Sequence, residues 1–216
     1  MVRILCLVIG YAFGLFQTSY IIGRMSGIDI REHGSGNAGT TNMLRTLGRK
    51  AGVLTFIGDC FKCVIAVALM RWIFGEKYGD IMPLLAFYTA TGVIMGHNFP
   101  FYLGFRGGKG IAATAGLGLA FDPLMAVMGL LTFFVTFKIT HYVSLGSLLV
   151  YVGILIELPI LGQMGYFGMT QAHLNELYLV SVFLAAMAFW RHKDNIKRLL
   201  SGTERKTYLN KKKPEI

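Results

Sequence analysis

The sequence predicts an all-α, polytopic integral membrane protein with a single domain over residues 1–216. Its composition is the first indication: 54% of the residues are hydrophobic, only 15% are charged, and the mean hydropathy is +0.56. These values are too apolar for an ordinary soluble domain of this length. The second indication is that the apolar residues gather into runs close to the roughly 20 residues that one membrane span requires.

The apolar runs predict the helices in chain order. Residues 4–23 are expected to form a span, because no A-x-A-like cleavage site follows them and a signal peptide would need one. Five further runs are long enough to cross a bilayer: 51–74, 81–96, 123–140, 142–161 and 173–190.

A seventh run, residues 111–121, is apolar but short. At 1.5 Å per residue it covers about half of the hydrocarbon core. Asp122 and Pro123 then predict a new helix, with Asp as its cap and Pro in its first turn. We therefore expect seven membrane helices, of which this one is short or half-inserted.

Lys and Arg residues are distributed unevenly between the two sets of loops, and this predicts orientation. One set contains Arg24, Arg31, Arg45, Arg49, Lys50, Arg106, Lys109 and Lys138, followed near the C-terminus by Arg191, Lys193, Lys197, Arg198, Arg205, Lys206, Lys211, Lys212 and Lys213. The other set has only Arg71 and Lys77, and residues 162–172 have none. The positive-inside rule then places the N-terminus outside and the C-terminus in the cytoplasm.

Three cytoplasmic motif loops are expected under this topology, at about residues 24–50, 97–110 and 191–205. A basic tail follows at 206–216, with a net charge of +10 over the whole chain. Attraction to anionic lipid explains such a tail, so membrane lipid is an expected partner and nucleic acid is not.

Polar residues within the predicted spans have structural and functional interpretations. Cys6, Cys60 and Cys63 fall within helices, and the C-x-x-C spacing lacks the soluble fold that a redox motif needs, which favours packing. Asp59 and Lys62 are three residues apart in one span. They predict an intramembrane ion pair that either serves function or locks helices together.

Residues 34–42, Gly-Ser-Gly-Asn-Ala-Gly-Thr-Thr-Asn, form a polar segment that cannot face lipid. Its three glycines let successive N–H groups converge on an anion. Arg31 and Arg45 flank the segment, and each can direct two donors at one phosphate. The G-x-G-x-x-G spacing lacks the preceding strand of a dinucleotide-binding unit, so nucleotide binding is not expected.

Two further polar segments fall on the same predicted side. Lys109, within Gly107–Gly110, precedes a helix start, where the helix dipole favours an anion, although a glycine hinge is the alternative interpretation. It is not an ATP-binding P-loop, because Leu103 and Gly110 stand where Gly and Ser or Thr are required. His192 and Asn195 share one helix face. Ser144 and Ser147 lie one turn apart near the same membrane side.

Together these segments resemble the bacterial acyl-phosphate-dependent glycerol-3-phosphate acyltransferases, the PlsY family. The matching stretches are Asp29–Arg31, Gly34–Asn37, Thr41–Asn42, Arg45, Gly96–His97, Gly107–Gly110, and His192, Asn195, Ile196 and Arg198. Hydropathy and spacing match over nearly the whole chain. The departures are Ala38, Thr40 and Cys63, where the family often has Pro, Ala and Gly.

The resemblance implies a bacterial inner-membrane enzyme that transfers a fatty acyl group from acyl phosphate to the 1-hydroxyl of glycerol 3-phosphate. Lysophosphatidic acid and phosphate would be the products, with no metal or other cofactor. The implied catalytic residues are Ser35, Asn37, Thr41, Arg45, Lys109, His192 and Asn195. The implied substrate-binding residues are Gly34, Gly36, Ala38, Gly39, Thr40, Asn42, Gly107, Gly108 and, with Ser144 as the alternative, Ser147.

Acyl phosphate carries a good leaving group, so direct attack by the glycerol hydroxyl is our mechanistic hypothesis. Lys109, Arg45 and His192 would hold glycerol 3-phosphate. The base would be the substrate's own phosphate or His192. Two alternatives stay open: a covalent route through Ser35, and an organic-phosphate transporter, which would need the broken helices and midplane anion site of carriers.

Overall fold

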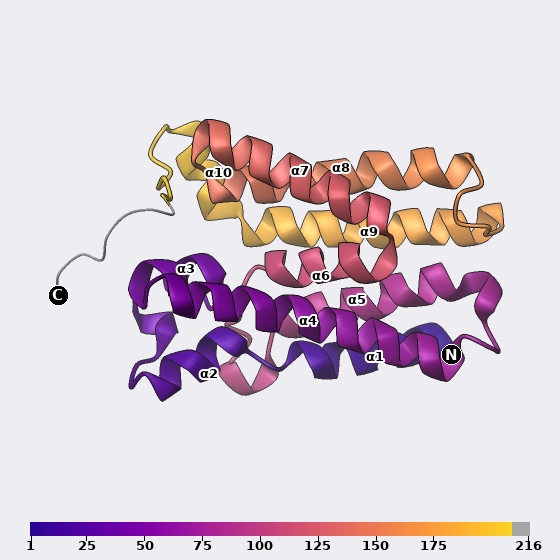
Figure 1. The fold of residues 1–216 in the computed structure, drawn as a ribbon, viewed down its shortest axis with the longest axis horizontal. Helices are drawn as coiled ribbons and strands as arrows, with labels where there is room; N and C mark the ends of the chain where they lie inside the picture. Colours follow the sequence, from indigo (N-terminus) through magenta and orange to yellow (C-terminus); the bar gives the residue numbers. More distant parts are fainter. Residues whose placement is uncertain (209–216) are drawn as a thin grey trace.

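The apolar runs fold into helices that lie along one common direction (Figure 1). The structure is a computed structural model that describes residues 1–208, and over this range the only regular elements are helices. The α-helices are α1 (Val2–Gly14), α2 (Thr18–Met25), α3 (Thr40–Thr46), α4 (Arg49–Phe74), α5 (Met82–Asn98), α6 (Ile111–Phe121), α7 (Pro123–Thr140), α8 (Val143–Gln163), α9 (Gln171–Arg191) and α10 (Lys193–Leu200).

Six segments of residues 1–208 are long and apolar enough to cross a membrane, and α6 is a shorter apolar helix, as the sequence predicts. Short 3₁₀ turns connect some of them: η1 (Ile30–Glu32), η2 (Gly79–Ile81) and η3 (Phe101–Leu103). In Figure 1, α7, α8 and α9 form one layer, α1, α4 and α5 form another, and α6 lies between them. The short helices α2, α3 and α10 gather at one end of the molecule.

The first span differs from the expectation of a single helix, because it breaks between α1 and α2. Hydrogen bonds stabilise the break: Gln17 is fully buried, and its Nε2 donates to the Gly14 carbonyl of α1 at 3.1 Å and to the Gly96 and His97 carbonyls of α5 at 3.3 and 3.1 Å. Lys62 of α4 donates to the Phe16 carbonyl at 2.7 Å. The Phe16 carbonyl is one that the helix break would otherwise leave unpaired in an apolar environment, and the bonds from Gln17 join the break to the end of α5.

Helices α1 and α5 pack with their backbones in contact. A Cβ on Gly92 would lie 2.1 Å from the Leu7 carbonyl oxygen, and one on Gly96 would lie 2.2 Å from that of Tyr11. Small residues at such a crossing allow the close approach that stabilises helix pairs in membranes. The segment that contains α5 is the most buried of the six candidate spans within residues 1–208.

Several local predictions are confirmed. Asp122 caps α7 by accepting from the Met125 amide at 3.0 Å, with Pro123 in the first turn. The three cysteines are free and buried. Asp59 and Lys62 form an ion pair at 2.9 Å.

Irregular segments bring the motif loops together at one end of the bundle. After α2, the chain passes through η1 and folds α3 back against α4, where Gly52 packs on Leu44. After α10, residues 201–208 return to the same end. The rest of the expected basic tail, including Lys211, Lys212 and Lys213, lies outside the described residues.

Candidate active site

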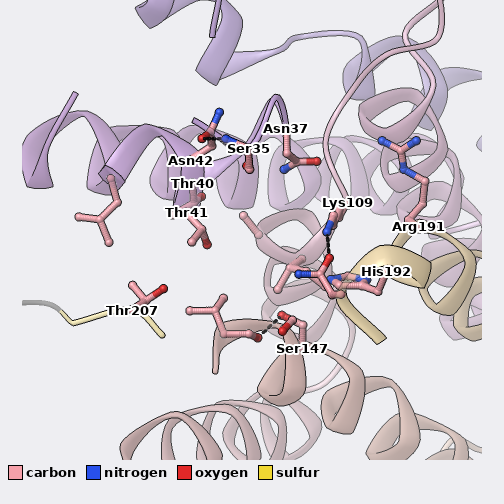
Figure 2. Close-up of a pocket in the computed structure, with 18 of the residues that line it drawn as sticks. Ser35, Asn37, Thr40, Thr41, Asn42, Lys109, Ser147, Arg191, His192 and Thr207 are labelled. Atoms are coloured by element: carbon pink, nitrogen blue, oxygen red, sulfur yellow. Dashed lines mark hydrogen bonds between the residues drawn. The ribbon is translucent and has the colours of Figure 1, made fainter. Parts of the chain in front are cut away.

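The three motif loops converge on one open cavity of about 1000 Å³ at the end of the bundle where α3 and α10 lie. Figure 2 shows residues of the glycine-rich loop on one wall, with Lys109 and His192 on the facing wall. All but two of the predicted site residues line the cavity. The predicted site residues that line it are Ser35, Asn37, Thr41, Arg45, Lys109, His192, Asn195, Gly34, Gly36, Gly39, Thr40, Asn42, Gly107 and Ser147.

Ala38 and Gly108 are the two predicted residues outside the cavity lining. Ala38 is fully buried in a small apolar cluster with Ile30 and Met43. Gly108 packs on the ring of His97, where a Cβ would lie 2.1 Å from Nε2. Both residues therefore support the cavity wall from behind.

The glycine-rich loop is shaped by backbone conformation and by Asn42. Gly34 and Gly36 have φ values of +63° and +69°, which favour glycine. The Asn42 Oδ1 accepts from the Ser35 amide at 2.9 Å, and its Nδ2 donates to the carbonyls of Ile30 and His33 at 3.1 and 3.0 Å. Asn42 uses its side chain to hold the loop.

The loop keeps a set of unused backbone donors. The amides of Asn37, Thr40 and Thr41 have no acceptor within residues 1–208, and all three residues line the cavity. By contrast, the Gly36 amide donates to the His33 carbonyl at 3.0 Å. Convergent free amides of this kind favour an anion.

Arg31 departs from the expectation that it directs two donors at a phosphate. Its Nη2 lies 2.6 Å from Asp29 Oδ2, and its Nη1 donates to the Leu103 carbonyl at 3.1 Å. It therefore ties the first motif loop to the second. Hydrogen bonds from Arg31 lower the pKa of Asp29 to about 2, so this carboxylate remains charged.

Hydrogen bonds to the backbone of the second glycine segment, Gly107–Gly110, hold the residues that precede Lys109 in place. The amides of Gly107 and Gly108 already donate to the Asn98 and His97 carbonyls at 3.3 and 3.1 Å. Their own carbonyls accept from Arg191 Nη2 at 3.0 and 2.7 Å. The glycine amides are thus used within the protein, in contrast to the expected phosphate-loop role.

A chain of hydrogen bonds runs from Lys109 to the C-terminal segment. Lys109 Nζ donates to Asn195 Oδ1 (Figure 2), and Asn195 Nδ2 donates to Glu204 Oε1 at 2.7 Å. Glu204 also accepts from Ser144 at 2.8 Å and from Arg198 at 2.7 Å. Although burial alone would raise the pKa of Glu204, these hydrogen bonds lower it. Glu204 was not predicted, because a single acidic residue near a basic tail gives no sequence signal.

Near neutral pH, Lys109 is charged and His192 is neutral. Burial, together with the nearby Arg198, lowers the pKa of Lys109 to about 8, which leaves it mostly charged at pH 7. Burial and the Lys109 charge lower the pKa of His192 to about 4, so its ring is neutral. Because His192 Nδ1 lies 2.8 Å from the Ala188 carbonyl, Nδ1 carries the proton and Nε2 has a free lone pair.

Arg45 enters the cavity from α3 and contacts the C-terminal segment. Its Nη2 donates to Thr207 Oγ1 at 2.6 Å and to the Arg205 carbonyl at 3.3 Å. The Thr207 amide donates in turn to the His141 carbonyl at 2.9 Å, which fixes this segment beside α7. The expected third motif loop extends to about residue 205, but no sequence pattern indicated that Glu204, Arg205 and Thr207 line one side of the site.

The remaining walls differ in polarity. Ser147 lines the cavity from α8, but its hydroxyl donates to the Val143 carbonyl at 2.8 Å, whereas Ser144 contacts Glu204. Within residues 1–208, no three His, Cys, Asp or Glu side chains form a metal-ligand set. The apolar flank of the cavity consists of Val53, Phe56, Phe133, Phe134 and Phe137.

An apolar helical bundle with cations and free amides at one end, and an apolar flank beside them, defines a multi-pass membrane enzyme suited to phosphorylated, lipid-like substrates. The chain belongs to the glycerol-3-phosphate acyltransferase family, whose model matches residues 4–202, and it is an acyltransferase.

Relatives cover almost the whole chain. A glycerol-3-phosphate acyltransferase of Clostridioides difficile (strain 630) is 46% identical, over 94% of each chain. One from Alkaliphilus metalliredigens (strain QYMF) is 41% identical, over 95% of this chain and 96% of the relative. The crystal structure of PlsY, an integral membrane glycerol 3-phosphate acyltransferase in its glycerol 3-phosphate form, is similar with a TM-score of 0.80 and 30% identity. That match covers 95% of this chain and 96% of the other.

Proposed function

We propose that this enzyme transfers a fatty acyl group from acyl phosphate to the 1-hydroxyl of glycerol 3-phosphate, giving 1-acylglycerol 3-phosphate and inorganic phosphate. The observation that carries the proposal is the pairing of free amides and cations with an apolar flank in one cavity. Phe134 and Val53 on that flank are 55% and 48% exposed, so an acyl chain can reach the site from the bilayer. Solved PlsY structures in glycerol 3-phosphate and lysophosphatidic acid forms support this acceptor and product.

The reaction proceeds by direct attack. The glycerol hydroxyl oxygen bonds to the acyl carbonyl carbon, and the bond from that carbon to the phosphate oxygen breaks. The hydroxyl proton passes to a phosphate oxygen. The Asn37, Thr40 and Thr41 amides offset the charge that develops, each worth about 2.7–4 kcal/mol.

The cationic and neutral side chains take separate roles. Lys109 and Arg45 hold the phosphate groups and supply proximity. His192 is neutral, so its Nε2 accepts a hydrogen bond from the attacking hydroxyl and orients it. Within residues 1–208, no histidine or carboxylate is hydrogen-bonded to the Ser35 hydroxyl, which favours direct attack over an acyl-Ser35 intermediate.

A donor comparison tests the proposal. Purified protein is supplied with labelled glycerol 3-phosphate and, in parallel, palmitoyl phosphate, palmitoyl-CoA or palmitoyl-acyl carrier protein. We expect lysophosphatidic acid with palmitoyl phosphate alone, and kinetics in which both substrates bind before phosphate leaves. Product from only a thioester donor would overturn the acyl phosphate assignment, and a ping-pong pattern would overturn direct attack.

We further propose that the enzyme lies in the bacterial inner membrane with this cavity facing the cytoplasm, which the distribution of Lys and Arg supports. The native cysteines are buried, so single exposed cysteines can be labelled selectively. In intact cells, Lys77→Cys should react with a membrane-impermeant maleimide, while Ser26→Cys and Ser201→Cys should react only after lysis. The reverse pattern would invert the topology.

A further inference from the structure

A buried polar cluster lies directly behind the second glycine segment, where α4 and α5 meet the break between α1 and α2. It consists of Asp59, Lys62 and His97, which are 1%, 5% and 3% exposed. Lys62 Nζ lies 2.9 Å from Asp59 Oδ1 and 3.0 Å from His97 Nδ1. Burying three ionisable groups is costly unless they are paired. Lys62 pairs with Asp59 Oδ1 and with His97 Nδ1, whereas Asp59 Oδ2 is buried without a hydrogen-bond partner within residues 1–208.

The contacts determine which nitrogen of His97 carries a proton. An ammonium group only donates. Lys62 Nζ lies 2.7 Å from Phe16 O, 2.9 Å from Asp59 Oδ1, 3.0 Å from His97 Nδ1 and, at the longest distance, 3.4 Å from Gly14 O. His97 Nδ1 must therefore accept. The alternative, donation from Nδ1 to Asp59 Oδ1, would span 3.6 Å, which is too long for a hydrogen bond. The proton consequently sits on Nε2.

The Nε2–H group faces the substrate cavity. His97 is one of the residues lining the cavity, and no acceptor for Nε2 exists within residues 1–208. The position of a Cβ on Gly108 would be 2.1 Å from Nε2 and 2.6 Å from the Ala38 carbonyl oxygen. His97 Nε2 thus stands where the two glycine-containing loops meet, and Gly108 leaves it room.

We propose that His97 is a further substrate-binding residue, whose Nε2–H donates to a phosphate oxygen at this junction. Lys62 and Asp59 are positioning residues that fix the ring and its tautomer. The second glycine segment uses the Gly107 and Gly108 amides internally, so the ring behind it supplies a donor at that wall. The ligand class is a phosphate monoester or acyl phosphate, and this inference rests on the proposed function.

A matched pair of variants distinguishes the role of His97 Nδ1 from that of Nε2. In His97→Asn, the amide oxygen can replace Nδ1 as the acceptor for Lys62, while the donor toward the cavity is lost. In His97→Gln, the longer amide can place a donor near the Nε2 position. His97→Asn loses one hydrogen bond to a charged phosphate oxygen. For at least one substrate, kcat/KM should therefore fall about 10- to 100-fold. The substrate affected identifies which phosphate is bound, and His97→Gln should recover part of the loss.

Stability measurements exclude a merely structural role. We expect His97→Asn to keep the wild-type Tm in detergent but to lose most of the Tm increase produced by glycerol 3-phosphate or inorganic phosphate. Thr91→Val is the matched control, because it removes a buried hydroxyl from α5 that does not line the cavity, and its kcat/KM should be unchanged. Wild-type kcat/KM in His97→Asn, or a loss of activity that only follows a fall in Tm, would overturn the proposal.

The wild-type enzyme gives an independent readout if the variants fold poorly. In protein with ¹⁵N-labelled imidazole, the His97 resonances should report a neutral ring with the proton on Nε2. That proton should shift downfield when inorganic phosphate or glycerol 3-phosphate is added. A proton on Nδ1, or no shift at saturation, would contradict the assignment. Because the wild-type acyl-transfer assay is run alongside, an inactive wild-type protein points to the proposed function instead of to His97.

Discussion

Helices α5 and α7 are both apolar and have 17 and 18 residues, yet they occupy opposite environments. In the most apolar part of the α5 segment, 72% of the residues are buried in the protein, against 11% in α7. Helix α5 buries its polar and small residues, Thr89, Thr91, Gly92, Gly96, His97 and Asn98, whereas leucine, valine and phenylalanine cover the exposed surface of α7.

The difference shows how a membrane protein inverts the usual relation between burial and hydrophobicity. Lipid solvates leucine as well as a protein core does, so apolar side chains gain little by moving inward. Backbone contacts and hydrogen bonds need protein partners, so small and polar residues concentrate at the centre. The site follows from this arrangement, because the segment that carries Lys109 continues from α5.

The largest expected effect comes from adding the same side chain to each helix. Gly92→Leu on α5 should destabilise the protein by more than about 3 kcal/mol, since even its Cβ would lie 2.1 Å from a backbone oxygen. Gly129→Leu on α7 should be tolerated, because the nearest atom to its Cβ is 3.8 Å away. Size-exclusion profiles and Tm in detergent measure both, and equal tolerance would show that α1 and α5 do not touch in this way.

Removal of one lysine from the segment that follows α5, and of one from the end of α7, should affect activity differently. Lys109→Ala should lower kcat/KM for glycerol 3-phosphate about 100- to 1000-fold, because a partly buried cation at the phosphate site is lost. Lys138→Ala, at the exposed end of α7, should leave kcat/KM unchanged. A Lys109→Ala enzyme with the wild-type requirement for glycerol 3-phosphate would remove Lys109 from the phosphate site.

The lowered pKa of Lys109 predicts that the KM for glycerol 3-phosphate depends on pH. Its pKa of about 8 means that the charge is present below pH 8 and is lost as the pH rises through that value. The KM for glycerol 3-phosphate should therefore rise about tenfold per pH unit above pH 8. In Lys109→Arg this rise in KM should disappear, because a guanidinium stays charged. If KM still rises above pH 8 in Lys109→Arg, the titration of another group causes the pH dependence.

The smallest effect is expected on the lipid-facing surface of α7. Leu131 is 59% exposed and does not line the cavity, so Leu131→Ala should change the free energy of unfolding by less than about 0.5 kcal/mol. Thermal unfolding in matched detergent measures this. A loss of several kcal/mol would mean that α7 contacts a protein surface in the membrane.

The sequence predicted the helices well because their lengths are set by the bilayer and their composition by lipid. Residues 123–140 and 111–121 match α7 and α6 at both ends. The convergence of the three motif loops also followed from placing their charges on one side. Whether that side is cytoplasmic, and the catalytic roles of these residues, stay predictions.

The sequence missed features that depend on partners distant in the chain. The Gly14 and Phe16 carbonyls at the break accept from Lys62, which lies 48 and 46 positions later in the chain, and no local pattern indicates this. Asn42 could be identified as polar, but its three contacts within the loop could not. The contact of Arg45 with Thr207 joins residues 162 positions apart and has no periodic pattern that would reveal it.

The break in the first span has a consequence for how the chain is made. Gln17 donates to carbonyls 79 and 80 positions later, so its partners do not yet exist when the first segment leaves the ribosome. At synthesis rates of about 5–20 residues per second, the delay is on the order of 4–16 s. During that time, the insertion machinery has to shelter an incomplete first segment, and a slower or faster ribosome alters the interval in which this nascent chain can misassemble.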